Sequence, residues 1–223
     1  MSILASQWQA VKTRIHQAEI SALRPEDSVR LLAASKSQPP QKLRELYSLG
    51  QRVFGENYVQ EAIPKIMALS DLDIEWHFIG PIQRNKTSLI AHHFKWVHGL
   101  DRLNIAERLN AACNASRLNV LIQVNIDNEP GKQGISPHDA IDFATEISKL
   151  PNLNLRGLMT IPRPVENGNN PNFNELRTVF QKLVNKGFKF DTLSMGMSND
   201  FEAAIMSGST CVRLGTALFG PRS

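Results

Sequence analysis

Short apolar runs alternate with longer segments of helical spacing along almost the whole chain. Residues 1–23 place apolar side chains at roughly helical spacing and predict an amphipathic helix. After a breaker at 24–27, the apolar run 29–35 predicts a buried strand. Residues 39–49 begin with two prolines and end before Gly50, which predicts a helix with a proline-tolerant first turn and a glycine stop.

The same alternation continues to the carboxyl-terminal end. Further strands are predicted at 52–54, 74–79, 96–100, 119–126, 153–161, 192–195 and 211–214. Further helices are predicted at 58–69, 84–93, 103–116, 137–150, 172–186 and 199–207. Strands separated by helices are typical of a parallel sheet, and eight such units predict a closed (β/α)8 TIM barrel with an extra N-terminal helix. A doubly wound open sheet is the alternative, but no G-x-G-x-x-G motif follows the first strand.

Composition fits a single domain over residues 1–223. The hydrophobic content of 42% and the charged content of 21% are ordinary for a globular protein with a sizeable core. The net charge of +4 suits a phosphate-bearing ligand, but basic residues occur only in pairs and triplets among acids, so we expect no nucleic-acid partner. A charged N-terminal segment and the absence of long apolar runs predict neither a signal peptide nor a membrane span. The low cysteine count, Cys113 and Cys211 alone, suggests a reducing compartment such as the cytoplasm, and their spacing does not suit a metal site.

Lys36 stands where the first predicted strand has just ended, within LLAASKSQPP at 31–40. Such barrels keep their chemistry at the carboxyl ends of the strands. An amine that loses solvent there is more easily neutral, and a neutral lysine can form a Schiff base with a carbonyl compound. The partner is a sugar phosphate, as in an aldolase, or pyridoxal 5′-phosphate; a solvated loop lysine is the plain alternative.

The last two predicted strands lead into segments that suit a phosphate group. Ser198 precedes a predicted helix, and Gly215 with Thr216 follows the final strand. Barrels often bind phosphate with these two loops and a nearby helix start. The alternative is purely structural: Asn199 caps the helix together with Glu202, and the later pair forms only a turn.

Charged residues near this predicted site require partners. Arg213 lies inside an apolar strand, where an unpaired charge is costly. It either pairs with an acid such as Glu56 or Glu75, or points into the barrel mouth and donates to a ligand. Asp200 and Glu202 would repel a phosphate unless their carboxylates point away.

Several longer blocks carry a family resemblance. They are FGENYVQE at 54–61, WHFIG at 76–80, GLM at 157–159, LSMGMS at 193–198 and VRLGTALFG at 212–220. With Lys36 after the first strand, they closely resemble the pyridoxal phosphate homeostasis protein family over nearly the whole chain. The resemblance implies a barrel like the N-terminal domain of alanine racemase, with pyridoxal 5′-phosphate (PLP) held as a Schiff base, an internal aldimine, on Lys36.

The resemblance also implies the cofactor-binding residues. Asn57 lies beside the ring, and Arg213 faces the pyridine nitrogen. The residues expected to hold the phosphate are Ser198, Gly215 and Thr216. The residues expected to line the rest of the pocket are His77, Met159 and Met195.

The implied function is PLP binding for homeostasis rather than robust catalysis. We expect a monomer that buffers PLP or delivers it to PLP-dependent apo-enzymes, since the chain stops at Ser223 with no second domain to supply a catalytic tyrosine. Its two tyrosines are Tyr47 and Tyr58. The alternatives are a PLP-dependent racemase or decarboxylase with Tyr58 or His77 as second base, and a cofactor-free aldolase. The polar loop 163–171 is predicted to be mobile, and we expect His98 to be a packed residue.

Overall fold

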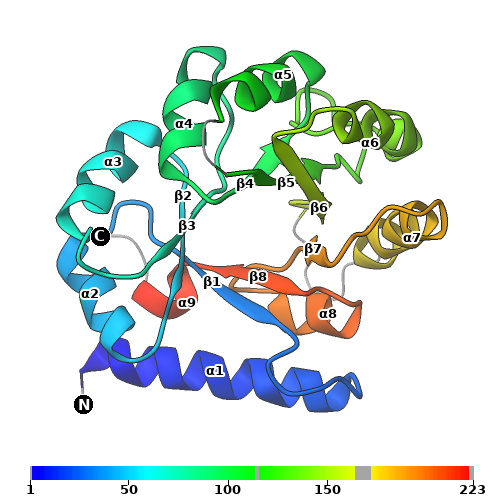
Figure 1. The fold of residues 1–223 in the computed structure, drawn as a ribbon. Coiled ribbons are helices and arrows are strands. Elements are labelled where there is room, and N and C mark those ends of the chain that lie inside the picture. The colour runs from blue at the N-terminus through cyan, green and yellow to red at the C-terminus, as the bar shows by residue number, and fades with distance from the viewer. Residues whose placement is uncertain (1, 114–115, 164–171, 221–223) are drawn as a thin grey trace.

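Eight parallel strands close into a barrel in the computed structural model, which describes residues 2–113, 116–163 and 172–220 (Figure 1). The strands follow chain order around the barrel, and β1 pairs with β8. They are β1 Arg30–Ala34, β2 Val53–Glu56, β3 Glu75–Phe78, β4 Trp96–Leu100, β5 Leu118–Gln123, β6 Leu153–Met159, β7 Thr192–Ser194 and β8 Cys211–Leu214. The predicted TIM-barrel fold is confirmed.

Helices surround the barrel on its outer side (Figure 1). They are α1 Ile3–Ser21, α2 Pro40–Ser48, α3 Val59–Ala68, α4 Thr87–His93, α5 Leu103–Ala112, α6 Ala140–Ser148, α7 Asn172–Asn185, α8 Phe201–Met206 and α9 Thr216–Phe219. Short 3-10 turns precede α4 at Arg84–Lys86 and α6 at Pro137–Asp139. No helix in the described part of the chain is long and apolar enough to cross a membrane.

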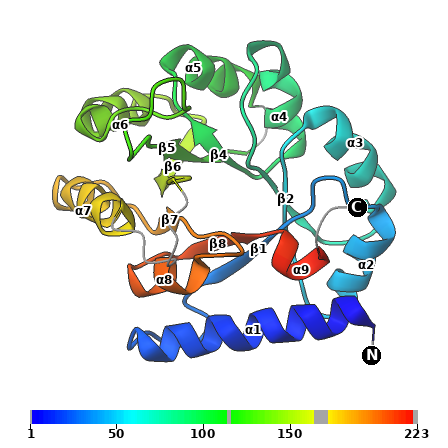
Figure 2. The same ribbon diagram turned by 180° about the vertical axis from the view of Figure 1, so that it is seen from behind.

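The extra N-terminal helix α1 covers the outside of the barrel where it closes. It packs against α8, α9 and α2, and both views show it running along that side (Figures 1 and 2). Its buried residues include Leu4, Val11 and Ile15, which recur at helical spacing. The Ser2 hydroxyl caps its start by accepting a hydrogen bond from the Ala5 N–H. Because α9 is only four residues long, α1 supplies the outer layer at this position.

Side chains alternate between the barrel interior and the layer under the helices. On β8, Val212 and Leu214 belong to the apolar core with Phe201 and Leu218. Arg213, between them, lines a cavity at the barrel mouth. The strands therefore supply an apolar outer face and a partly polar interior.

Closure of the barrel fixes which loops meet. In the β1–β8 pair, Leu32 lies opposite Arg213 and Ala33 lies opposite Leu214. The chain then leaves both strands at the same edge, through Lys36 on one side and Gly215 on the other. Residues almost 180 positions apart in sequence are thus neighbours because the last strand pairs with the first.

Predicted and observed boundaries differ mostly by a few residues. The structure ends β5 at Gln123 and β6 at Met159, whereas apolar residues beyond both ends had suggested longer strands. Helix α8 begins at Phe201 rather than Asn199. The predicted mobile loop 163–171 lies outside the described residues except for Arg163.

Gly157 on β6 provides a test of how tightly the barrel is packed. Its φ is +151°, and an added Cβ would lie 1.8 Å from the Thr192 carbonyl oxygen on β7. We predict that Gly157→Ala lowers the free energy of unfolding by about 3 kcal/mol, measured by urea denaturation, because backbone on both strands must shift. Gly131→Ala is the control: its φ is +78° with nothing within 4 Å, so only the backbone penalty of about 1–2 kcal/mol remains. Equal losses in the two variants would contradict a packing constraint.

Candidate functional site

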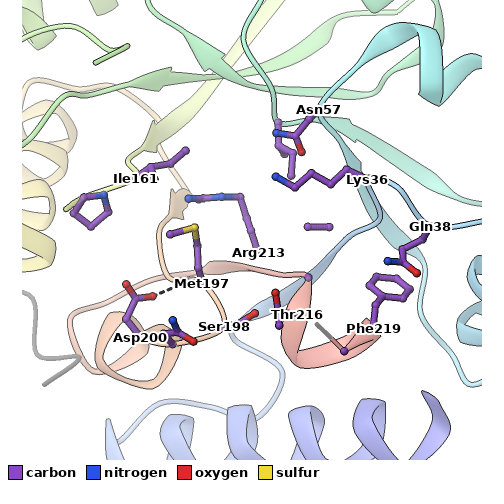
Figure 3. Close-up of a pocket in the computed structure, with 16 residues that line it drawn as sticks. Lys36, Gln38, Asn57, Ile161, Met197, Ser198, Asp200, Arg213, Thr216 and Phe219 are labelled. Carbon is purple, nitrogen blue, oxygen red and sulfur yellow. Dashed lines mark hydrogen bonds between the residues drawn. The ribbon is translucent and has the colours of Figure 1, made fainter. Parts of the chain in front are cut away.

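A cavity of about 400 Å³ opens at the carboxyl ends of the strands. Figure 3 shows Lys36 entering it from the turn after β1 and Arg213 from β8, with Asn57 near Lys36 and with Ser198 and Thr216 on another side. Six of the nine predicted site residues line this cavity: Lys36, Asn57, Ser198, Arg213, Gly215 and Thr216. A cavity of this size is in the range that binds small molecules.

The turn that carries Lys36 is held on both sides of that residue. The Ser35 N–H donates to the Gly55 carbonyl oxygen at 2.9 Å, and the Lys65 ammonium donates to the Ser35 carbonyl oxygen at 2.8 Å. The Ser37 N–H donates to the Glu61 carboxylate, and Ser37 itself has φ +61°. Lys36 is half-buried in this turn. Neighbouring hydrogen bonds therefore fix the backbone from which its side chain enters the cavity.

A buried ion pair lies beneath this turn. Lys65 Nζ donates to both Glu56 oxygens, at 2.9 and 3.1 Å, and to Glu61 Oε1 at 2.7 Å. The Ser35 hydroxyl donates to Glu56 Oε1 at 2.6 Å. Glu56 is fully buried and Lys65 is 6% exposed. Burial raises the pKa of Glu56, while Ser35 and Lys65 oppose that rise. The carboxylate thus links Ser35 after β1 to Lys65 in the last turn of α3.

Asn57 follows Glu56 and reaches the cavity wall. Its Oδ1 is buried and has no hydrogen-bond partner among the described residues. A Cβ on Gly80 would lie 2.1 Å from the Asn57 carbonyl oxygen, so the loop after β3 approaches closely only because residue 80 is glycine. Asn57 therefore lines the cavity from a closely packed loop, while its Oδ1 is closed to solvent.

Arg213 is buried, with 6% of its surface exposed, and two interactions orient its guanidinium. Nη1 donates to Ser194 Oγ at 2.6 Å, and Nη2 donates to the Thr160 carbonyl oxygen at 2.9 Å. Burial lowers the pKa of Arg213, but an arginine stays protonated at neutral pH. The suggested ion pairs with Glu56 or Glu75 are wrong, since these carboxylates bind other groups. Arg213 instead lines the barrel mouth.

The loops after β7 and β8 are joined by a side-chain hydrogen bond. Ser198 Oγ accepts from the Ala217 N–H at 3.1 Å. Gly215 lies against the end of β1, where an added Cβ would be 3.4 Å from the Ala34 carbonyl oxygen. Thr216 begins α9 and is exposed. Two hydroxyls and a close backbone segment consequently line one side of the cavity.

The predicted capping alternative for this region is wrong. Helix α8 has Asp200 at its N-cap position rather than Asn199, with no side-chain cap hydrogen bond. Asp200 lines the cavity, but its Oδ1 accepts from the Met197 N–H at 2.6 Å, and burial raises its pKa. Glu202 instead binds Arg14 on α1, so only one of the two carboxylates is near the cavity.

Three predicted pocket residues lie elsewhere, and the expectation for them is corrected. Met195 packs in the apolar layer with the helices, because Ser194 before it takes the interior position on the strand. Met159 packs in a small cluster with Trp96. His77 lines a separate cavity of about 240 Å³ that also includes Arg30 at the start of β1, toward the opposite end of the barrel.

The predicted packing of His98 is confirmed. It is fully buried, and its Nε2 lies 2.9 Å from His77 Nδ1 while its Nδ1 lies 3.0 Å from Ser194 Oγ. Burial lowers the pKa of both histidines, well below 6.5 for His98, where His77 and Arg213 lower it further. No group of three potential metal ligands occurs among the described residues.

Sequence reasoning missed the residues that support the site. Glu61 and Lys65 have the i,i+4 spacing of a helical ion pair, and Glu75 and His77 alternate on one face of a strand. These spacings could have paired them, but nothing in the sequence shows that Lys65 reaches under the Lys36 turn.

Comparison with known proteins gives the same family by domain model and by full-length relatives. The model of the alanine racemase N-terminal domain matches residues 8–223. A Pseudomonas aeruginosa protein is 49% identical over 100% of this chain and 97% of its own, and one from Escherichia coli K12 is 45% identical over 100% and 98%. Both are named pyridoxal phosphate homeostasis protein.

Solved structures agree with this result. PipY from Synechococcus elongatus, solved with PLP bound, superposes with a TM-score of 0.82 at 36% identity, covering 94% of this chain and 100% of PipY. Alanine racemase from Corynebacterium glutamicum has a TM-score of 0.69 at 15% identity, covering 96% of this chain and 61% of the racemase. The racemase shows a shared fold alone.

The ion pair beneath the Lys36 turn is testable by substitution. We predict that Lys65→Met lowers the free energy of unfolding by about 3–5 kcal/mol in urea denaturation, because Glu56 is left as a buried charge without its partner. Adding Glu56→Gln should recover part of the loss. Lys149→Met, which breaks an exposed pair with Glu146, should cost less than about 1 kcal/mol. A small loss in Lys65→Met would contradict the buried pair.

The lowered pKa of His98 predicts a pH dependence of stability. Between pH 7.5 and 5.5 the unfolded chain gains a proton at His98 near its ordinary pKa of 6.5, and the folded chain does not. The free energy of unfolding therefore falls as pH falls, by about 1 kcal/mol from this residue. Urea denaturation at the two pH values should show a smaller fall for His98→Asn than for the wild type. An unchanged difference in His98→Asn would exclude this contribution.

Proposed function

This chain belongs to the pyridoxal phosphate homeostasis protein family, and from that premise we propose that it binds PLP reversibly at Lys36 and buffers or delivers it. Two bacterial relatives that match this chain over nearly their full length carry the family name, and PipY was solved with PLP bound. The single observation that carries the proposal is that Lys36 and Arg213 enter one cavity with Asn57 and the β7 and β8 loops.

The residues of the cavity fit PLP chemically. When bound, PLP supplies an aldehyde and an electron-accepting ring. Lys36 provides the amine for a reversible covalent link to that aldehyde. Asn57 supplies an amide side chain at the cavity wall near Lys36 (Figure 3). Arg213 provides a fixed cation that donates hydrogen bonds.

Ser198, Gly215 and Thr216 form the proposed phosphate-binding group. Two hydroxyls can donate to phosphate oxygens, and the glycine lets a ligand approach the backbone closely. The resulting arrangement separates the anion at the β7 and β8 loops from the amine at the end of β1. It would hold the two ends of one small aromatic aldehyde.

Binding without robust catalysis follows from the groups around the cavity. Arginine at the pyridine nitrogen donates a hydrogen bond and disfavours protonation there, which makes the ring a weaker electron sink than a carboxylate partner would. Among the described residues no tyrosine lines the cavity: Tyr58 is 58% exposed and Tyr47 lies on α2. His77 lines the other cavity. These placements give no support to either residue suggested as a second base for a racemase or decarboxylase.

The proposal extends to how the protein works. Residues 1–223 act as one PLP-binding barrel domain in the cytoplasm, and the protein works as a monomer. The recipients are PLP-dependent apo-enzymes, which need the same aldehyde. A covalent but reversible link suits this transfer, because the cofactor is held without being consumed.

Covalent labelling tests the proposed function. Purified protein is incubated with PLP, reduced with borohydride and mapped by peptide mass spectrometry. We predict stable modification at Lys36, because reduction fixes the link between the amine and the aldehyde. Lys36→Ala should lose the modification, and Lys42→Ala, which removes the next lysine along the chain, should keep it.

Two outcomes would contradict the proposal. Modification spread over surface lysines, or retained in Lys36→Ala at the same level, would remove the binding role of Lys36. Incubation of the PLP-loaded protein with a broad panel of amino acids should give no turnover at ordinary enzyme rates, roughly 1 per second or above. Robust racemisation, decarboxylation or transamination would instead establish an enzyme.

A further inference from the structure

Four hydrogen bonds join Arg213 at the barrel mouth to Glu75 near the opposite cavity. Arg213 Nη1 lies 2.6 Å from Ser194 Oγ, and Ser194 Oγ lies 3.0 Å from His98 Nδ1. His98 Nε2 lies 2.9 Å from His77 Nδ1, and His77 Nε2 lies 2.9 Å from Glu75 Oε1. We call these five residues the hydrogen-bond chain. They come from β8, β7, β4 and β3, so the hydrogen-bond chain crosses the barrel interior.

The donor-only guanidinium of Arg213 at one end and the acceptor-only carboxylate of Glu75 at the other set the directions of the bonds while both histidines are neutral. A guanidinium can only donate, so Ser194 Oγ accepts from Arg213. The Ser194 hydroxyl can then donate to His98 Nδ1, which must be unprotonated to accept. Neutral His98 carries its proton on Nε2 and donates to His77 Nδ1. His77 in turn carries its proton on Nε2 and donates to the Glu75 carboxylate.

Burial makes this arrangement stable against exchange with water. Ser194 and His98 are fully buried, and His77 is 1% exposed. Buried polar groups in such a low-dielectric setting are strongly committed to their partners. At the far end the Glu75 side chain is 37% exposed and accepts a second bond from Arg30 Nη1 at 2.6 Å. The far carboxylate therefore stays charged and fixes the tautomer of the histidine beside it.

We propose that His98 and His77 are positioning residues for the cofactor site, acting through Ser194 on Arg213. The inference rests on the proposed function, in which Arg213 faces the pyridine nitrogen of PLP. With Ser194 held as an acceptor on Nη1 and the Thr160 carbonyl on Nη2, the plane of the guanidinium is fixed. Its other N–H groups then have a set direction toward a ligand.

Protonation of the histidines would disrupt the hydrogen-bond chain, because a ring nitrogen that accepts a hydrogen bond would become a donor. A proton on His98 Nδ1 would make both His98 and Arg213 donors to one hydroxyl, with two positive charges on either side of it. The groups that face this region are Glu75 and Arg30 beside His77, and Cys211 and Arg213 beside Ser194. The second cavity adds Asp27, Arg156 and Asp191 around His77. Lowered pKa values keep both histidines neutral and so preserve the donor direction.

Two matched pairs of variants test the proposal in the PLP-loaded protein. His98→Leu removes the acceptor for Ser194, whereas His98→Asn restores an acceptor near the Nδ1 position. Ser194→Ala removes the acceptor for Arg213, whereas Ser194→Thr keeps a hydroxyl. Each protein is measured for its PLP dissociation constant, its visible absorption maximum and its borohydride labelling at Lys36.

His98→Leu and Ser194→Ala should raise the dissociation constant about three- to tenfold, the effect of losing one buried hydrogen bond. Their absorption maximum should move while labelling at Lys36 persists, because only the orientation of Arg213 at the ring nitrogen changes. His98→Asn and Ser194→Thr should return both values toward wild type. A general loss of stability would lower occupancy without moving the maximum of the PLP that remains bound.

The outcomes separate this inference from the proposed function. If wild type is not labelled at Lys36, both fail. If all proteins are labelled and the leucine and alanine variants keep the wild-type absorption maximum and affinity, the positioning role alone is overturned. Equal defects in His98→Asn and His98→Leu would also overturn it. Should His98→Leu fail to fold, the Ser194 pair carries the test by itself.

Discussion

Pairing of the first strand with the last is the interaction on which the site depends. An open sheet with its strands in chain order would leave Lys36 and Gly215 at opposite edges, because they follow the first and the last strand. The parallel register of β1 with β8 sets Leu32 against Arg213 and brings the next loops to one rim. Helix α1 supports that closure from outside, where α9 is too short to cover it. The N-terminal helix is thus part of what holds the cavity together.

Polar groups inside the barrel form a hydrogen-bonded network where apolar packing is usual. An interior filled by branched apolar residues is the usual way to stabilise such a barrel. Here the interior holds Arg213, Ser194, His98 and His77, and each satisfies the next. A fully paired network fixes orientation, whereas a partly paired one is costly. The network therefore makes the barrel less tolerant of substitution and sets the direction of one cation at its mouth.

Much of this arrangement was predictable from sequence, and the limits have physical causes. Alternation of apolar runs and helical segments gave eight strands, and the rule that barrel chemistry follows the strands brought Lys36, Ser198 and Gly215 together. Which side chains point inward depends on strand register. The sequence predicts Met195 in the pocket, but Ser194 takes the interior position and Met195 packs under the helices. An ion pair of Arg213 with Glu56 is a reasonable prediction from sequence, but sequence cannot show that Lys65 on α3 already binds Glu56.

A site that stores an aldehyde has different requirements from one that transforms an amino acid. Storage needs a reversible covalent bond, a fixed anion-binding group and a ring that is not strongly activated. Turnover also needs a second acid or base on the far side of the substrate. The cavity offers Lys36 and a cation held by buried hydrogen bonds, while Tyr58 stays exposed and His77 is committed to Glu75 and His98. Because that histidine already has both ring nitrogens occupied, recruiting it for proton transfer would break the network that orients Arg213. Within this barrel, His77 therefore serves the hydrogen-bond network and not the role of a second acid or base.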